Sequence, residues 1–182
     1  MTQLQSRPTA DAAADIRADI VALLPKMRRF ALGLSGSADK ADDLVQDAVE
    51  RALTHADQWE PGTRLDSWLY RIVQNCWISQ GRKAAVRHRW QERESFAPQA
   101  YEDGRRTVEG RLDLARVMDA YTGLSPKLRS VAALVILDGE SYQQAAEVLG
   151  VPIGTVMSRV SRAREALREA CDGAMAVDRQ PA

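Results

Sequence analysis

The residues best suited to chemistry lie between Glu140 and Ala170, where two amphipathic patterns flank a glycine. Gly150 closes the first pattern and Pro152 opens the second, so the spacing predicts a helix, a tight turn and a second helix. The second helix has one apolar face. Its outward side carries hydroxyls and arginines, with one arginine on the flank: Thr155, Ser158, Arg159, Ser161 and Arg162. Small polar side chains beside arginines allow close approach to base edges, so the stretch predicts a DNA-binding helix-turn-helix. The alternative is an ordinary amphipathic hairpin with a solvated polar face.

A second basic group follows a helix that we expect to start at about Arg64. Between Arg82 and Arg93 the chain has five bases and one acid, and Trp77 and Trp90 are interleaved with the basic residues. Cationic side chains for phosphates and flat rings for unstacked bases are what a single-stranded nucleic-acid surface needs. The alternative places the tryptophans in the core, and we expect this for Trp68 more than for Trp77.

An acidic segment opens the helix that we expect over about residues 40–59. It has five acids and one base between Asp39 and Glu50. Acids in a first turn stabilise the helix dipole, which accounts for the earliest of them. That effect does not extend to Asp47 or Glu50, which share an exposed face with Gln46. A surface for a basic partner and a solvated helix face are both compatible with this spacing, and the spacing alone favours neither.

Composition excludes several classes of protein. The chain has 182 residues, 45% of them hydrophobic and only 5% aromatic, with few β-branched runs, so we expect an all-α protein that buries a core. The 25 basic and 25 acidic residues balance, which suggests separate surfaces for separate partners rather than general DNA coating. Two cysteines and two histidines at unrelated spacings predict no metal site and no cofactor. We also find no catalytic set, no signal peptide and no membrane span, and expect a non-enzymatic cytoplasmic protein.

The helical patterns divide the chain into two small helical domains joined by a flexible linker, the second containing the helix-turn-helix. We expect the first helix over about 16–34, with Pro25 marking its true start. Thr63 with Asp66 resembles a capping box, and Ser125 before Pro126 an N-cap with a first-turn proline. The expected organisation is a disordered leader (1–14), a first domain (15–93), a linker (94–107), a second domain (108–171) and a disordered tail (172–182).

Two stretches resemble the extracytoplasmic-function (group IV) sigma factors of the sigma-70 family, the promoter-specificity subunits of bacterial RNA polymerase. DDLVQDAVERAL, followed by a tryptophan and LDSWLYRIVQNCWISQGRK, is similar to the family's region 2. LSPKLRSVAALVILDGESYQQAAEVLGVPIGTVMSRVSRAREAL is similar to its region 4. With the linker, the resemblance covers roughly residues 20–170. The stretches around GLSGSADKADDLVQDA and WEPGTRLDSWLYRI also resemble the general-stress-response subgroup.

The resemblance implies a role for each surface. Region 2 of the family binds the clamp helices of the largest polymerase subunit through its acidic helix, which assigns core contacts to Asp43, Gln46, Asp47 and Glu50. The next loop, residues 60–65, would capture a flipped base of the −10 element. The melted −10 strand would lie on Arg64, Arg71, Asn75, Trp77, Arg82 and Lys83. Region 4 would read the −35 element through Ser158, Arg159, Ser161 and Arg162, with Thr155 at a phosphate.

One position departs from the family pattern, because Met157 stands where members often have a base. This departure implies that one −35 contact is lost or becomes apolar. The family also implies core polymerase, promoter DNA and an anti-sigma factor as partners, with stress response as the setting. The alternative function is a stand-alone helix-turn-helix regulator, although a protein that reads only duplex DNA would not need the basic segment with its tryptophans.

Overall fold

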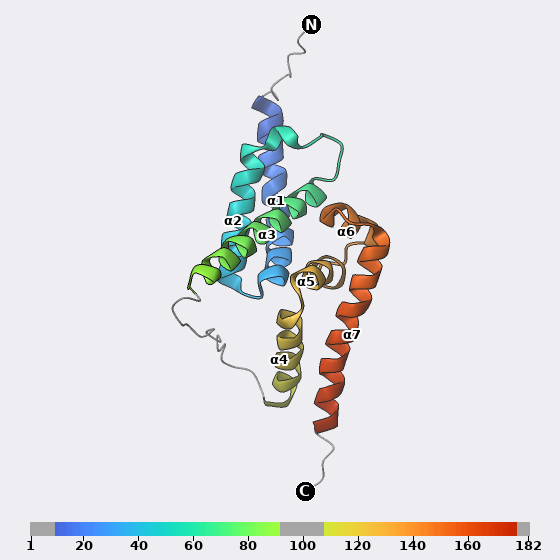
Figure 1. Ribbon diagram of the computed structural model, residues 1–182. Helices are drawn as coiled ribbons and strands as arrows, with labels where there is room; N and C mark the ends of the chain where they lie inside the picture. The colour runs from blue at the N-terminus through green and yellow to red at the C-terminus, as the bar shows by residue number, and fades with distance from the viewer. Residues whose placement is uncertain (1–9, 92–107, 178–182) are drawn as a thin grey trace.

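The computed structural model describes residues 10–91 and 108–177, and every regular element within these ranges is helical, as expected (Figure 1). The first half contains α1 (Ala10–Ser35), α2 (Ala38–Thr54), the short 3-10 turn η1 (Ala56–Gln58) and α3 (Leu65–Gln91). The second half contains α4 (Val108–Gly123), α5 (Pro126–Ala132), the π-helical turn η2 (Ala133–Leu137), α6 (Tyr142–Leu149) and α7 (Ile153–Val177).

The first half is a three-helix unit in which α3 crosses the α1–α2 pair (Figure 1). Pro25 lies inside α1 and does not begin it, so that prediction was wrong. A proline removes one backbone hydrogen bond. Ile16 and Ile20 before it and Met27 and Phe30 after it are all buried, so apolar packing holds the two parts of α1 in one helix.

Other helix ends also differ from the expected ones. α2 ends at Thr54, before the short turn η1. The Thr63 hydroxyl donates to the carbonyl of Glu60, and Asp66 accepts the Ser67 N–H, so the expected Thr63–Asp66 capping box does not form. α1 covers residues 10–14 of the expected leader, and α7 covers residues 172–177 of the expected tail. The expected linker, residues 94–107, lies outside the described residues.

The second half holds the helix-turn-helix, α6 and α7. Ser141 and Gln144 form a capping box at the start of α6, and Gly150 closes that helix in the left-handed conformation with φ of 62°. A left-handed residue directs the chain into α7, which is the role expected for this glycine. Pro126 occupies the first turn of α5 as predicted, although the Ser125 side chain makes no cap hydrogen bond. α4 lies beside the lower part of α7 (Figure 1).

The two halves pack against each other, and one cluster of buried side chains runs through both. The two halves approach closely at Gly33 of α1, because a Cβ built there would lie 2.9 Å from the Cβ of Ala133 in η2. The Tyr121 hydroxyl donates to the Gly33 carbonyl at 2.8 Å, across the same contact. The two predicted domains therefore form one packed body in this structure.

Candidate nucleic-acid interface

The outward face of α7 carries the residues predicted to read duplex DNA. Val156, Val160 and Ala163 are buried and fix the orientation of the helix. Consequently Ser158, Ser161 and Arg162 are exposed, whereas Thr155 and Arg159 are half-buried at the edges of the face. The Ser158 hydroxyl donates to the Thr155 carbonyl at 3.0 Å, which keeps it close to the helix. The structure thus brings the five predicted residues to one helix end, with three of them exposed.

Two apolar side chains lie beside this face. Met157 is 53% exposed and Ile153, one turn earlier, is 44% exposed. Residues four apart on a helix are neighbours, so the pair forms a small apolar patch at the edge of the reading face. Met157 departs from the family pattern in the sequence, whereas Ile153 belongs to the apolar periodicity of this helix, which predicts that it faces the core.

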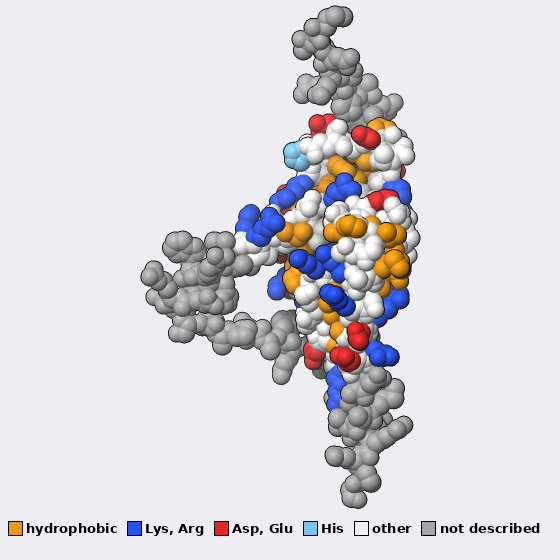
Figure 2. Space-filling view, turned by 45° about the vertical axis from the view of Figure 1, so that its right-hand side comes forward, with side chains coloured by type: hydrophobic (Ala, Val, Ile, Leu, Met, Phe, Trp, Pro, Cys, Tyr) orange, Lys and Arg blue, Asp and Glu red, His pale blue; other side chains and the backbone are white. Residues whose placement is uncertain are grey.

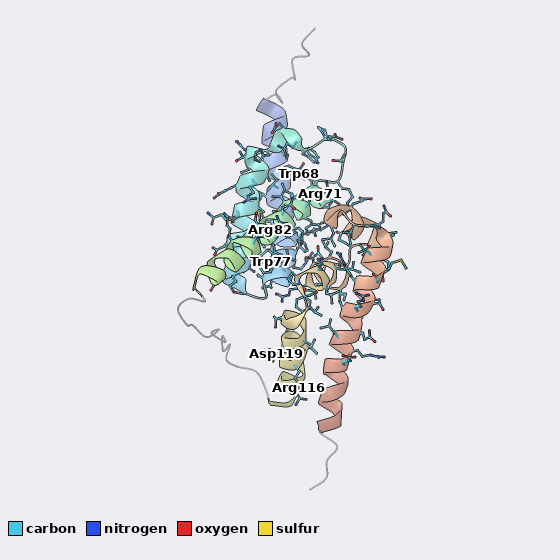
Figure 3. The ribbon with its side chains drawn as sticks, in the orientation of Figure 1. Trp68, Arg71, Trp77, Arg82, Arg116 and Asp119 are labelled. Atoms are coloured by element: carbon cyan, nitrogen blue, oxygen red, sulfur yellow. The ribbon has the colours of Figure 1, made fainter. Side chains whose placement is uncertain are left out.

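A polar stripe follows α3. Arg71, Asn75 and Arg82 are exposed, and their spacing of four and seven residues places them on one side of the helix. Ile78, 39% exposed, belongs to the same stripe and was missed because a lone isoleucine in an amphipathic pattern is counted as core. Trp77 is half-buried and packs against the core, away from the stripe, while Lys83 is exposed. The helix runs from Trp68 and Arg71, near α6, toward Trp77 and Arg82 (Figure 3).

Two of the predicted −10 residues contact the second half of the chain. Arg71 donates to the backbone carbonyl of Glu147 in α6 at 2.8 Å. Arg64 Nη2 lies 2.6 Å from Asp66 Oδ2 and 3.2 Å from Glu140 Oε2. Hydrogen bonding by Arg64 lowers the pKa of the Asp66 carboxyl, so that acid stays ionised beside the arginine. These arginines therefore have partners within the protein.

A buried carboxylate lies behind the same contact. The Asp138 side chain is 2% exposed and pairs with Arg29 of α1, with Nη2 to Oδ1 at 2.7 Å. Its second oxygen accepts a hydrogen bond from the Tyr70 hydroxyl of α3. Burial, together with this hydrogen bond, raises the pKa of Tyr70 well above its usual range, so the phenol remains a donor. Asp138 thereby joins α1, α3 and η2, a role that no local sequence pattern indicates.

The acidic face of α2 also forms as predicted. Asp43, Gln46 and Glu50 are exposed and Asp47 is half-buried, all on one side of the helix. Gln46 donates to Glu50 at 3.2 Å, and Gln80 of α3 donates to Asp47 at 3.0 Å. Hydrogen bonding to amides holds two of the carboxylates in place and leaves their charge unneutralised.

Basic side chains form separate groups on the surface. Figure 2 shows Lys and Arg side chains in several groups over one face, with apolar side chains between them. Among the described residues no group of His, Cys, Asp and Glu could hold a metal ion. Nor does any helix in these ranges have the length and apolar character needed to cross a membrane.

Comparisons with known proteins find relatives over most of the chain. A family model described as the sigma-2 domain of PhyR matches residues 20–74, and one described as sigma-70 region 4 matches residues 114–167. The chain is 39% identical over 155 residues to the ECF RNA polymerase sigma factor EcfG of Rhodopseudomonas palustris, covering 84% of this chain and 82% of the relative. It is 29% identical over 165 residues to the ECF sigma factor SigW of Bacillus subtilis, covering 85% and 88%.

Solved structures show the same two-domain architecture. The sigma factor RpoE in its complex with the anti-sigma factor NepR from Bartonella quintana is 35% identical and superposes with a TM-score of 0.73, covering 87% of this chain and 97% of that one. CnrH, in its complex with the cytosolic domain of CnrY, is 26% identical with a TM-score of 0.62, covering 90% and 94%. The chain belongs to the extracytoplasmic-function family of RNA polymerase sigma factors.

Proposed function

We propose that three surfaces of this sigma factor divide the work of promoter recognition. The acidic face of α2 binds core polymerase, the stripe of α3 with the loop at residues 60–65 holds the melted −10 strand, and α7 reads the −35 element. The observation that carries this assignment is the separation of the α3 stripe from the exposed face of α7 on two different helices. One protein with two such surfaces suits a promoter that offers both duplex and single-stranded DNA.

The chemistry of each surface supports its assigned partner. Carboxylates on α2 complement a basic partner and steer its approach. Arg71 and Arg82 provide charge for phosphates, and the exposed Ile78 between them offers an apolar contact for an unstacked base. Arg162 can donate two hydrogen bonds to a guanine edge, and the hydroxyls of Ser158 and Ser161 can donate to or accept from a base edge. From the similarity to the sigma factor EcfG we infer a non-enzymatic subunit that acts with RNA polymerase in the cytoplasm.

An anti-sigma factor is a further partner that we infer. Both RpoE and CnrH were solved bound to other proteins, NepR and the cytosolic domain of CnrY respectively. Similarity to the sigma-2 domain of PhyR and to EcfG supports a role in a stress response.

Run-off transcription tests the proposal. Purified chain plus core polymerase should yield a transcript from a promoter mapped after overexpression of the chain, and core alone should not. No transcript from the reconstituted enzyme, with the chain folded by circular dichroism, would contradict the proposal. Duplex binding without transcription would favour the stand-alone regulator instead.

A further inference from the structure

Gly81 lies beside the exposed stripe of α3, in the interior of that helix. α3 continues without a break from Leu65 through Gly81 to Gln91. Alanine and most other residues are favoured over glycine inside a helix, because glycine loses more backbone freedom when it becomes ordered. A glycine at such a position therefore needs a reason, which is either structural or functional.

No other glycine whose surroundings the structure describes raises the same question. Four of them have a positive φ, which a side chain would strain: Gly36, Gly62, Gly139 and Gly150. Gly33 is interior to α1, and a Cβ there would lie 2.9 Å from the Ala133 Cβ. Gly123 and Gly154 lie in the end turns of α4 and α7, whereas the preference for alanine is that of a helix interior.

No structural reason of these kinds applies to Gly81. Its φ lies outside the left-handed region. Apart from its chain neighbours and its own helix backbone, nothing in the described residues lies within 4 Å of a Cβ built there. An alanine would therefore fit the backbone and meet no neighbour, so the fold alone would be more stable with alanine than with glycine.

A side chain at position 81 would cover two apolar residues of α3. Side chains on a helix lean toward its N-terminus, so each one lies over the residues three and four positions before it. For position 81 these are Ile78, which is 39% exposed, and Trp77, which is half-buried. Because Gly81 has no side chain, the accessible parts of both stay uncovered. We name this open space over Ile78 and Trp77 the Gly81 notch.

Basic side chains lie next to the Gly81 notch. At about 100° per residue, Arg82 points ~40° to one side of Ile78 and Gly81 lies ~60° to the other. Arg82 and Lys83 are both exposed, and Arg82 lies on the same stretch of α3 as Trp77 (Figure 3). An apolar floor with an aromatic ring, beside cationic groups, suits an unstacked base and its phosphate.

We propose that Gly81 is a positioning residue, and that its notch receives one base of the melted −10 strand against Ile78 and Trp77 while Arg82 binds a neighbouring phosphate. The inference rests on the proposed function for the placement of the strand on α3, and it adds the point on the helix where one base lies. A base stacked inside a duplex has no free face for this floor, so the notch favours the melted form of the element.

Gly81→Ala and Gly81→Gln should change stability and DNA binding in opposite directions. Both new residues are better helix formers than glycine, so the Tm of the free chain should rise by about 2–4 °C. Binding of the melted strand should weaken about threefold in Gly81→Ala and about tenfold in Gly81→Gln, because the larger side chain fills the notch. A purely structural role would not lower DNA binding while raising the Tm.

Binding is measured on holoenzyme reconstituted from each variant and core polymerase. The probe is a fluorescein-labelled single strand with the non-template −10 sequence of the promoter mapped after overexpression, and its anisotropy reports the bound fraction. Gly123→Gln is the matched control, because Gly123 is exposed, lies outside the three proposed surfaces and has nothing within 4 Å of an added Cβ. In an Ile78→Ala background Gly81→Gln should cost less affinity, since part of the contact that it blocks is already lost.

The outcomes separate the notch from the proposed function. Weaker strand binding by both Gly81 variants, with a Tm at or above that of the wild type, supports the notch. Wild-type affinity in both variants would overturn it, and so would a lower Tm, which would give Gly81 a structural role. Loss of core binding in these variants would place Gly81 on the core surface and overturn it as well. A wild-type holoenzyme that makes no transcript would instead contradict the proposed function.

Discussion

The exposed face of α7 and the stripe of α3 carry similar groups, arginines beside short polar side chains, but they are in different states. On α7, Ser158, Ser161 and Arg162 face solvent. On α3 and the loop before it, Arg71 and Arg64 already bind oxygens of the second half. The proposed −35 surface is therefore accessible, whereas two arginines of the proposed −10 surface already have partners within the protein.

The acidic face of α2 is a third surface to compare with α3 and α7. Charge reversal there has the largest expected effect, a loss of affinity for core polymerase. Reversing Asp47 and Glu50 to lysine should weaken the complex with core polymerase by about 30-fold or more, because like charges would then oppose each other. Co-purification or competition for core polymerase measures this. Reversing Asp57 and Asp119, two exposed acids outside the three surfaces, should leave the complex intact. Equal affinity for all three proteins would remove α2 from the core-binding surface.

Arg162→Ala tests whether the exposed face of α7 binds duplex −35 DNA. It should lower affinity for duplex −35 DNA by about tenfold, within the 1–3 kcal/mol typical of a base contact, and leave core binding unchanged. Arg162 is exposed, so its replacement leaves the packing of α7 unchanged. Equal loss of duplex binding and of core binding would contradict the assignment of Arg162 to the −35 element.

Tyr70→Phe tests the hydrogen bond from α3 to Asp138, which joins the two halves. It removes the hydroxyl that donates to Asp138 but keeps the edge-on packing against Phe30, where the ring centroids are 5.1 Å apart. The free energy of unfolding should fall by about 1–2 kcal/mol, since a buried carboxylate loses the hydrogen bond to one of its oxygens and keeps only Arg29 as a partner. Tyr142→Phe, whose hydroxyl has no hydrogen bond to the described residues, is the control for thermal or chemical denaturation. Equal stability of both variants would show that Asp138 does not depend on Tyr70.

Replacement of Met157 has the smallest expected effect, and it tests whether α7 recognises a thymine in the −35 element. Its exposed side chain, beside Ile153, suits the 5-methyl group of a thymine in the major groove. Replacing that thymine by deoxyuridine should weaken −35 binding about threefold, near the ~0.8 kcal/mol of one buried methyl. In Met157→Ala the same replacement should have little effect. A wild-type protein indifferent to every thymine methyl in the element would leave Met157 without this role.

Local patterns allowed much of this fold to be predicted. Gly150 and the apolar periodicity of α7 depend on neighbours a few residues away, and they predicted the helix-turn-helix and the face that it exposes. Pro126 likewise predicted the start of α5. The same periodicity placed Asp43, Gln46, Asp47 and Glu50 on one side of α2. Pro25 was misread because a local rule about proline was overruled by burial of side chains on either side of it.

The contact between the halves could not be predicted from spacing. Tyr70 and Asp138 are 68 residues apart, and Arg64 and Glu140 are 76 residues apart. Each is an ordinary residue in its own helix or turn, and only tertiary packing brings the pairs together. For the same reason Arg64 and Arg71 could be assigned to DNA from the family resemblance without any indication that the chain itself occupies them.

The assignment of α3 and α7 to two separate promoter elements predicts that the two reading surfaces separate on the promoter. Energy transfer between the halves measures this directly. Donor and acceptor dyes on cysteines introduced at Ala22 of α1 and Gln143 of α6, both exposed, report the distance between the halves. Cys171 would be replaced by serine, and Cys76 is buried. High energy transfer in the free chain should fall when core polymerase and promoter DNA are both added. Unchanged transfer in a complex that initiates transcription would contradict the account.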